Sequence, residues 1–461
     1  MKSIQQIVEN VMCQVMKISM GNKKDGIKGI AKGIQSIVND TSLEILEIVL
    51  AEIDDQLYQD KDCRKQWSVV RKDDPKTLMT CVGELTYRRR YYRDKNTGEY
   101  RYLLDDWLGV TPHQQIGEDV REDLVSSAVN VSYQKSGKQS APKPVSKTSV
   151  GHYVDDVDVK AIMQSDGKKR ICKELYVEAD EDHVALQSGK NVQVRLIYVH
   201  EGNISDTKRA QLGHVRYLTW PVGGDTDDMW ETVATYIEEQ YDTDKLQHIW
   251  LSGDGAAWID KGEEWLIKCR RLLDRYHVNK RFMSLTASVP YLRGWGRQVL
   301  KQGTKAQINA LYEHAVRKAD TKNKREQLVE DTRYLLSHWD QITAGRSSDA
   351  PGCSAEGHIS HVLSARLSSR PMGWSLPGLN QMAALRVMAA NGTPITYERR
   401  KTHEEACARP LPSKVLSAAA VNVRGKIDSA IKNIRLPILA AGQYTPTYMA
   451  LRGLAYRNTL L

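Results

Sequence analysis

Apolar positions recur at helical intervals in the first 60 residues of the chain. Between Leu43 and Leu57 they lie three or four residues apart, which places them on one face of a helix. Thr41 and Glu44 have the spacing of a capping box, so we predict a helix start near Thr41. One apolar face of this kind indicates packing against a core, with contact between two copies as the less favoured use.

From residue 172 onward the pattern changes to short apolar runs that predict strands and helices in alternation. Three strands come first: KELYVEAD, NVQVRLIYVH and HVRYLTW. Then follow the helix DMWETVATYIEEQY, the strand HIWLSGD, the helix GAAWIDKGEEWLIKCRR and the strand LLDRYHV. Three strands followed by helix, strand, helix and strand is the order of a ribonuclease H-like fold. We therefore predict an α/β protein with a ribonuclease H-like core.

A hairpin is predicted over residues 78–104, where LMTCVGELTYRRRYY and EYRYLL flank the turn sequence DKNTG. Arg88, Arg89 and Arg90 alternate there with tyrosines, a mixture that suits phosphate contact and base stacking. A solvated hairpin that covers a core with its tyrosines explains the pattern equally well.

A second basic region follows at residues 117–160. Its helix-like stretch, GEDVREDLVSSAVNVSYQKSG, leads into a Lys/Ser/Pro-rich run that begins near Lys135 and Lys138. Two short helices around a Gly/Ser turn would form a helix-turn-helix DNA reader. A basic linker remains the alternative.

Composition narrows the class of protein. The chain has 461 residues, 41% of them hydrophobic, and a net charge of +9, which favours a polyanionic partner. No apolar run reaches the ~18 residues of a membrane helix, and the N-terminus lacks a signal peptide's apolar stretch. The seven cysteines are scattered without a CxxC, which disfavours zinc knuckles and disulfide frameworks. We expect a reduced, cytoplasmic protein.

Three acidic residues carry the candidate chemistry. Asp180 closes the first predicted strand, Asp254 closes the fourth, and Glu356 opens a later helix-like segment. Carboxylates held by a sheet are suitable ligands for two Mg²⁺ (or Mn²⁺) ions about 3.5–4 Å apart, the arrangement that activates the attacking and leaving oxygens in phosphoryl transfer. If the fold brings these acids together, they form a site for cutting and joining nucleic acid.

Asp180 and Asp254 also have simpler interpretations, and for Asp180 this is an exposed acidic turn. Asp180 is crowded by neighbouring acids, and Asp182 is the next best choice for its role. Asp254 would serve as a helix N-cap in the turn Ser-Gly-Asp-Gly-Ala, where Gly253 and Gly255 leave room for an approaching phosphate.

Basic residues surround the fourth and fifth predicted strands and the third acid. Candidate phosphate contacts are Arg270, Arg271 and Arg275 near the fifth strand, and Arg366 and Arg370 after Glu356. Asp274 and His277 lie in the fifth predicted strand, where they would add an acid or a proton-handling histidine. A structural role is the favoured interpretation of His277.

These motifs resemble the ISLre-type bacterial insertion-sequence transposases, relatives of the Mutator-like DDE transposases. The resemblance spans about residues 80–380 and rests on YLLDDWLGV, ELYVEADEDHVALQ, LIYVHEG, WLSGDGAAWI, LLDRYHVNK and GCSAEGHISHVLSARLSSRPMGWS, in that order. It implies a ribonuclease H-like core, a DDE triad of Asp180, Asp254 and Glu356, and a helical insertion before the third acid. The intervals of 74 and 102 residues between these acids leave room for that insertion.

Pattern and resemblance together predict six segments. They are a helical region (1–60), a β-hairpin and helix-turn-helix-like DNA-binding region (61–165), a first core part (166–285), a helical insertion (286–348), the third-acid helix of the core (349–385) and a C-terminal region (386–461).

The resemblance implies a transposase that cleaves DNA at the ends of an insertion sequence and joins it to target DNA. Its partners would be the terminal inverted repeats, target DNA and further copies of itself, as a homodimer or larger assembly at the bacterial nucleoid. Two alternatives stay open: a ribonuclease H-like nuclease without strand transfer, and a non-catalytic DNA-binding regulator.

Overall fold

The computed structural model describes residues 4–21, 26–159, 169–205, 211–347, 350–369 and 373–396, with positions 421 and 425. Two compact units divide this part of the chain. The first spans Met1–Ala128 and Ser132–Asp156, and the second spans Val129–Val131 and Val157–Thr396. Arg370 and most of the predicted C-terminal region lie outside the described residues. None of the helices within the described ranges has the length and apolar composition needed to cross a bilayer.

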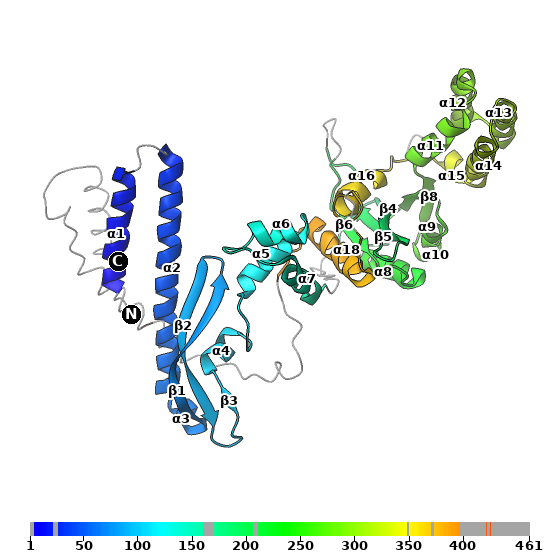
Figure 1. Ribbon diagram of the computed structural model, residues 1–461. Coiled ribbons are helices and arrows are strands. Elements are labelled where there is room, and N and C mark those ends of the chain that lie inside the picture. The colour runs from blue at the N-terminus through cyan, green and yellow to red at the C-terminus, as the bar shows by residue number, and fades with distance from the viewer. Residues whose placement is uncertain are drawn as a thin grey trace. The chain divides into compact units, whose positions relative to one another are not determined.

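The first unit begins with long helices, as the apolar periodicity predicts (Figure 1). Its elements in chain order are α1 (Ile4–Gly21), α2 (Gly26–Gln59), α3 (Lys61–Gln66), β1 (Trp67–Thr80), β2 (Gly83–Asp94), β3 (Tyr100–Arg101), α4 (Leu103–Leu108), α5 (Glu118–Ala128), α6 (Tyr133–Gln139) and α7 (Lys147–Asp156).

The predicted helix start at Thr41 is wrong, because α2 runs through it. Thr41 donates its hydroxyl to the carbonyl of Ile37 at 2.6 Å, and Ser42 donates to Val38 at 2.8 Å. Bonds to the carbonyl four residues earlier satisfy hydroxyl groups inside a helix. The capping-box spacing at Thr41 is therefore coincidental.

The hairpin region contains three strands rather than two. A turn at Cys81 and Val82 splits the first predicted strand into β1 and β2, which pair antiparallel. The predicted DKNTG turn joins β2 to the short β3, with Gly98 at a φ of 77°. The apolar face of α2 packs on this sheet, as expected, and the cluster includes Leu50, Ile53 and Leu57 of α2 and Leu85, Tyr87 and Tyr92 of β2.

Helices α5, α6 and α7 pack together around buried Val120, Leu124 and Val150. Ser136 of α6 donates its hydroxyl to the carbonyl of Leu124 at 2.6 Å. The chain leaving α6 returns close to it, since the Val145 N–H donates to the carbonyl of Gly137 at 2.8 Å. Gly137 is therefore a point of close backbone approach.

The second unit is a mixed sheet with helices, which confirms the α/β class. Its strands are β4 (Glu174–Ala185), β5 (Asn191–His200), β6 (Arg216–Thr219), β7 (His248–Gly253) and β8 (Cys269–Leu273). The order across the sheet is β6-β5-β4-β7-β8. β5 is antiparallel to β4 and β6, while β7 is parallel to β4 and β8 is parallel to β7.

One face of this sheet forms the main core. Leu175, Val177 and Ala179 alternate along β4 and pack with Trp230 and Val233 of α8 (Thr226–Gln240). The opposite face of β4 carries Glu178, Asp180 and Asp182. It is covered by α16 (Ala355–Ile359) and the π-helical turn Ser360–Ser364, while α17 (Ala365–Leu367) and α18 (Leu376–Ala390) follow in the chain.

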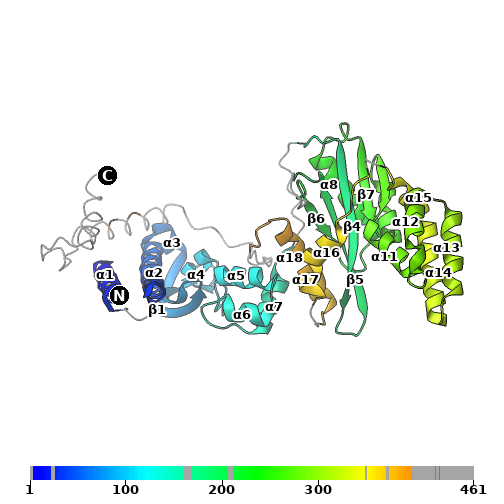
Figure 2. The same ribbon diagram turned by 90° about the horizontal axis from the view of Figure 1, so that it is seen from above.

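The polar stretch before the third acid is helical, in line with its periodicity. It contains α11 (Arg275–Leu285), the 3₁₀ turn Pro290–Leu292, α12 (Arg293–Gln302), α13 (Lys305–Arg317), α14 (Lys322–Ser337) and α15 (Trp339–Ala344). These helices share a separate core that includes Phe282, Leu311 and Leu335. Figures 1 and 2 show them as a lobe beyond the β8 edge of the sheet.

Two predicted boundaries around the fifth strand are wrong. The single helix expected over 255–271 is broken into α9 (Ala257–Asp260) and α10 (Gly262–Trp265), and β8 already begins at Cys269. The strand expected over 272–278 ends at Leu273, because Asp274 accepts the N–H of Tyr276 at 2.9 Å and caps α11.

We expect Gly137→Ala to destabilise the first unit by about 1–3 kcal/mol. A Cβ at Gly137 would lie 2.1 Å from the carbonyl oxygen of Val145, a backbone atom with little freedom to move. Gly151→Ala in α7 is the matched control, because its Cβ would meet nothing nearer than Tyr133 at 3.5 Å. Thermal unfolding of both variants tests this, and equal midpoints would contradict it.

Candidate metal centre

Three aspartates lie at the same level across three neighbouring parallel strands. Glu178 of β4 pairs with Ser252 of β7, and Gly253 of β7 pairs with Leu273 of β8. Continuing these registers by one or two residues brings Asp180, Asp254 and Asp274 level with one another. The parallel sheet thus gathers acids that are far apart in the sequence.

Asp180 lies within β4 and not at its end, contrary to the prediction. The strand continues unbroken to Ala185, because β5 pairs with it throughout, with Asp180 opposite Leu196 and Asp182 opposite Val194. Since side chains alternate along a strand, Glu178, Asp180 and Asp182 all point to the same face. Their contacts distinguish them.

Glu178 fastens the segment that carries the third acid. Its buried carboxylate lies 3.1 Å from Nε2 of His200 and accepts the Ser354 N–H at 2.6 Å and the hydroxyl of Tyr198. Burial alone would raise the pKa of Glu178, but these hydrogen bonds outweigh it and lower the pKa. Because Ser354 immediately precedes α16, this bond sets the position of Glu356.

Asp182 is tied to the far end of the same covering segment. Its carboxylate accepts the hydroxyl of Ser368 at 2.8 Å, and burial raises its pKa. Asp182 thus points to the chain after α17, while Asp180 points to Glu356.

Glu356 lies in the first turn of α16, the helix predicted to begin there. Ligand atoms of Asp180, Glu356 and His277 all lie within 4.8 Å of one another. The Nε2 atom of His277 is buried, has no hydrogen-bond partner among the described residues, and lies 3.9 Å from Asp274. His277, for which a structural role was favoured, therefore belongs to the acidic cluster.

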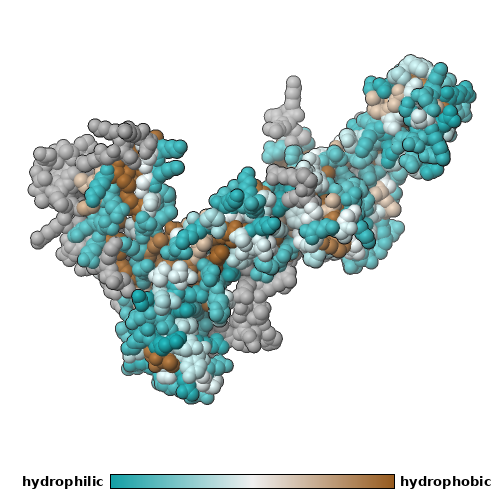
Figure 3. All heavy atoms as spheres, viewed as in Figure 1, coloured by the Kyte–Doolittle hydropathy of each residue, from teal (hydrophilic) through white to brown (hydrophobic). Residues whose placement is uncertain are grey.

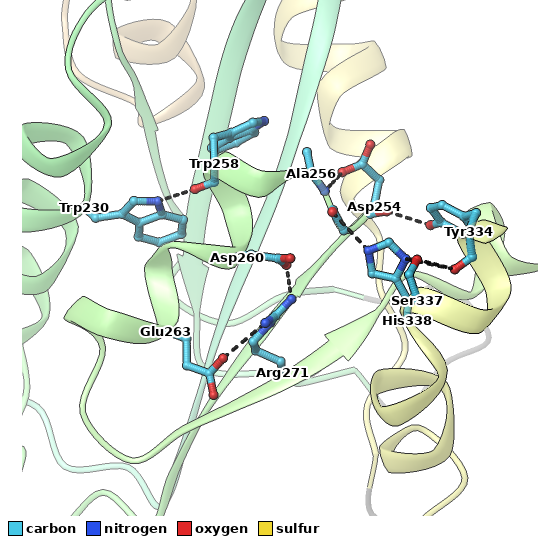
Figure 4. Close-up of polar contacts among 11 residues, drawn as sticks. Trp230, Asp254, Ala256, Trp258, Asp260, Glu263, Arg271, Tyr334, Ser337 and His338 are labelled. Atoms are coloured by element: carbon cyan, nitrogen blue, oxygen red, sulfur yellow. Dashed lines mark hydrogen bonds and ion pairs between the residues drawn. The ribbon is translucent and has the colours of Figure 1, made fainter. Parts of the chain in front are cut away.

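The turn that carries Asp254 is held by the helical lobe (Figure 4). Asp254 accepts the N–H of Ala256 through its side chain at 2.9 Å, and its carbonyl accepts the hydroxyl of Tyr334 at 2.6 Å. His338 lies with Nε2 3.2 Å from the carbonyl oxygen of Gly255. Sequence reasoning missed Tyr334 and His338, because nothing in their local pattern distinguishes them from other polar helix positions.

Gly255 was predicted to leave room for a phosphate, but its backbone angle and the nearby His338 are what require a glycine there. Its φ is 86°, and a Cβ there would lie 2.4 Å from Nε2 of His338. The space beside Gly255 is thus filled by a side chain of the protein rather than kept open for a phosphate.

Crowding of negative charge shifts the titration of Asp180. Burial is the main cause, and the charges of Asp254, Glu356 and Asp274 add to it, raising the pKa of Asp180 to about 7. The N–H of Glu181 acts in the opposite direction. Burial likewise raises the pKa of Asp274.

The donor set fits a divalent cation. Carboxylate oxygens are the ligands that Mg²⁺ and Mn²⁺ prefer, and the unpartnered buried nitrogen of His277 suits Mn²⁺ as well. A bound cation would also relieve the repulsion that raises the pKa of Asp180. Asp180 and Glu356 supply the carboxylate donors of the group that lies within 4.8 Å, and Asp254 and Asp274 are close enough to act on Asp180 electrostatically.

Several basic residues proposed for DNA contact are engaged within the protein. Arg90 pairs with Asp54 and Asp55, while Arg89 pairs with Asp105 and lies 3.6 Å from the centre of the Tyr102 ring. The same holds for Arg271, paired with Asp260 and Glu263 (Figure 4), and for the buried Arg366, which lies over Trp374. The exposed candidates are Arg88, Lys135, Lys138, Arg270 and Arg275.

Comparison with known proteins identifies relatives over nearly the whole chain. Residues 23–404 match the model of UPF0236, an uncharacterised protein family. Two UPF0236 proteins of Caldanaerobacter subterraneus subsp. tengcongensis are each 36% identical to the chain. One aligns over 442 residues (95% of both chains) and the other over 456 (98% of this chain and 97% of the relative). A "UPF0236 protein in vanSb 3′ region" of Streptococcus gallolyticus is 23% identical over 79% of this chain and 83% of its own.

We expect Asp180→Asn to stabilise the cation-free protein above pH 7. Because its pKa is raised in the folded protein, the Asp180 carboxyl favours folding while it is protonated. Its contribution to the stability of the wild type is therefore lost as the pH rises from about 4 to 7. The amide of the Asp180→Asn variant does not titrate, so the variant keeps its stability over this range. The difference should approach a few kcal/mol at pH 8, from about 1.4 kcal/mol per pKa unit.

Urea unfolding between pH 4 and pH 8 in the presence of a chelator measures this difference. Glu178→Gln is the matched control, and it should destabilise at pH 8, because the lowered pKa means that its ionised form favours folding. Added Mg²⁺ should stabilise the wild type and leave Asp180→Asn almost unchanged. Destabilisation by Asp180→Asn at pH 8 would contradict this account of the site.

Proposed function

We propose that this chain, which belongs to the uncharacterised UPF0236 family, is a DNA transposase of a bacterial insertion sequence. The observation that carries the proposal is the cluster formed by Asp180 of β4 and Glu356 of the covering helix α16, with Asp254 close enough to act on Asp180 electrostatically. These are the three acids that the resemblance to ISLre-type transposases nominates.

The sheet topology supports a ribonuclease H-like core. Three antiparallel strands in chain order, β4, β5 and β6, are followed by β7 and β8, which add in parallel on the other side of β4. The helical lobe α11–α15 lies between the second and third acids in the chain, where the resemblance implies an insertion.

The naming of the relatives adds independent support. One protein of Caldanaerobacter subterraneus subsp. tengcongensis carries eleven designations joined in a single name, and another carries four. One protein with many designations in a single organism is the pattern that copies of a mobile element produce.

Asp180, Asp254 and Glu356 would hold the divalent cations, and Asp274 and His277 lie close enough to assist. When bound, the two ions would supply Lewis-acid activation of the attacking oxygen and charge relief at the leaving oxygen. In the proposed reaction water attacks a phosphodiester at the element's end and leaves a 3′-hydroxyl. The P–O3′ bond breaks in this step, so the other product is a 5′-phosphate. The 3′-hydroxyl then attacks a phosphorus of the target DNA, loses its proton, and displaces the 3′-oxygen of the target strand, which leaves as a hydroxyl.

The residues around the acids position them for this chemistry. Glu178 fixes the start of α16 through Ser354, and Tyr334 and His338 hold the Asp254 turn. Such preorganised ligands reduce the reorganisation needed during the reaction. Within the first unit, the exposed Arg88, Lys135 and Lys138 are the proposed contacts to the terminal inverted repeats, and Arg270 and Arg275 of the second unit are proposed contacts to DNA near the acids.

A strand-transfer assay tests the proposal. We expect the protein with Mg²⁺ to join a pre-cut DNA end, taken from the inverted repeats flanking its coding sequence, to plasmid DNA. Asp254→Asn and Asp180→Asn should lower cleavage and joining by at least about 10³-fold. Asp182→Asn should stay within about tenfold of the wild type, because an amide oxygen still accepts the Ser368 hydroxyl.

The same assay separates the two alternatives. Cleavage without joined product would identify a nuclease that lacks strand transfer. Specific DNA binding with no Mg²⁺-dependent activity, unchanged by Asp254→Asn, would identify a non-catalytic regulator.

A further inference from the structure

Four large apolar side chains are exposed along one face of α2. Ile27, Ile34, Val38 and Ile45 have 81%, 36%, 50% and 44% of their surface exposed. At about 100° per residue they fall within about 40° of one another around the helix axis, in a row about 27 Å long. We refer to these four residues as the α2 stripe. Figure 3 shows hydrophobic surface on the α1–α2 pair.

Other faces of α2 are covered by the chain itself. α1 packs beside Gly33, where a Cβ would lie 2.7 Å from Cδ1 of Ile18, and Ile37 on that side is buried. Leu50, Ile53 and Leu57 pack into the hairpin core. Within the described residues of the first unit, the α2 stripe lies between these two contacts and stays exposed.

The spacing of the α2 stripe is that of a coiled-coil seam. Its members are separated by seven, four and seven residues, and small residues complete an alternation of threes and fours. The full series is Ile27, Ala31, Ile34, Val38, Thr41 and Ile45. A seam of this kind fits another helix with the same repeat, and α2 itself is such a helix.

We propose that the α2 stripe binds the α2 stripe of a second copy of this chain, with the two helices antiparallel. A two-fold axis that crosses the seam at the height of position 36 places Ile27 against Ile45 of the second copy and Ile34 against its Val38. The seam is therefore self-complementary, as a two-fold interface requires.

Charge along α2 selects the antiparallel direction. Residues 26–39 contain Lys28 and Lys32 and no acid, whereas residues 40–51 contain Asp40, Glu44 and Glu47 and no Lys or Arg. Antiparallel helices set the basic half of one copy along the acidic half of the other, and parallel helices would set like charges together.

An apolar groove extends the same surface. It has a volume of about 530 Å³, and its lining includes Ile45 of the α2 stripe, Leu46 and Leu50 of α2, and Leu78 and Leu85 of the hairpin. Antiparallel pairing brings Ile27 of the second copy, the most exposed member of the α2 stripe, to the edge of this groove.

Sedimentation equilibrium of the full chain without DNA tests the interface. We expect a concentration-dependent dimer whose dissociation constant rises at least about 100-fold in Ile34→Glu and in Val38→Glu, since each buries a charge in the seam. Ser36→Glu is the matched control, because it adds the same charge to an exposed position on the opposite face of α2 and should leave the dimer intact. Circular dichroism checks that all variants remain helical.

A charge pair tests the direction. The double variant Ile34→Glu with Val38→Lys should regain the dimer, because antiparallel helices place each introduced acid against an introduced base of the other copy. A wild type that is monomeric throughout, stripe variants that dimerise like Ser36→Glu, or a double variant that stays monomeric would each overturn the proposal. No DNA enters these measurements, so a dimer without strand-transfer activity would count only against the proposed function.

Discussion

The candidate metal centre depends on one buried carboxylate that is not itself a proposed metal ligand. Glu178 accepts hydrogen bonds from Tyr198 and the Ser354 N–H and lies beside His200, so its charge is compensated inside the protein. These bonds join β4 to the segment that begins α16. Together with the hydrogen bond between Tyr217 and Nδ1 of His358, they hold Glu356 at the height of Asp180, more than 170 residues away in the sequence.

Around this anchor the structure keeps repelling charges close together. The ionised form of Asp180 is destabilised, since burial and three neighbouring acids raise its pKa. Such crowding lowers the stability of the cation-free protein, and a bound divalent cation would offset the loss. The helical lobe contributes rigidity, because Tyr334 and His338 hold the Asp254 turn from outside the sheet. The site is thus held both by Glu178 of β4 and by the helical lobe that lies between Asp254 and Glu356 in the chain.

Local patterns predicted much of the fold. The strands β4, β5, β6 and β7, the helix α8 and the helical character of the lobe all follow from apolar periodicity, which reflects burial of one face at a time. Some predictions failed on local capping and hydroxyl bonds, at Thr41 and Asp274, and others failed where a contact distant in sequence decided the outcome. β4 continues past Asp180 because β5 pairs with it. The helix expected at 255–271 is interrupted at Lys261, and Gly262, which begins α10, packs against Trp230 with no room for a side chain.

By itself the sequence determined which acids are the candidates for the site: local strand and helix ends and the resemblance predict Asp180, Asp254 and Glu356. Only the tertiary structure decided how these acids are held and which neighbours join them. Strand register brings Asp274 level with Asp180 and Asp254, and packing places His277 beside Asp180 and Glu356. Register and packing arise from contacts between segments far apart in the chain, so no local pattern records them.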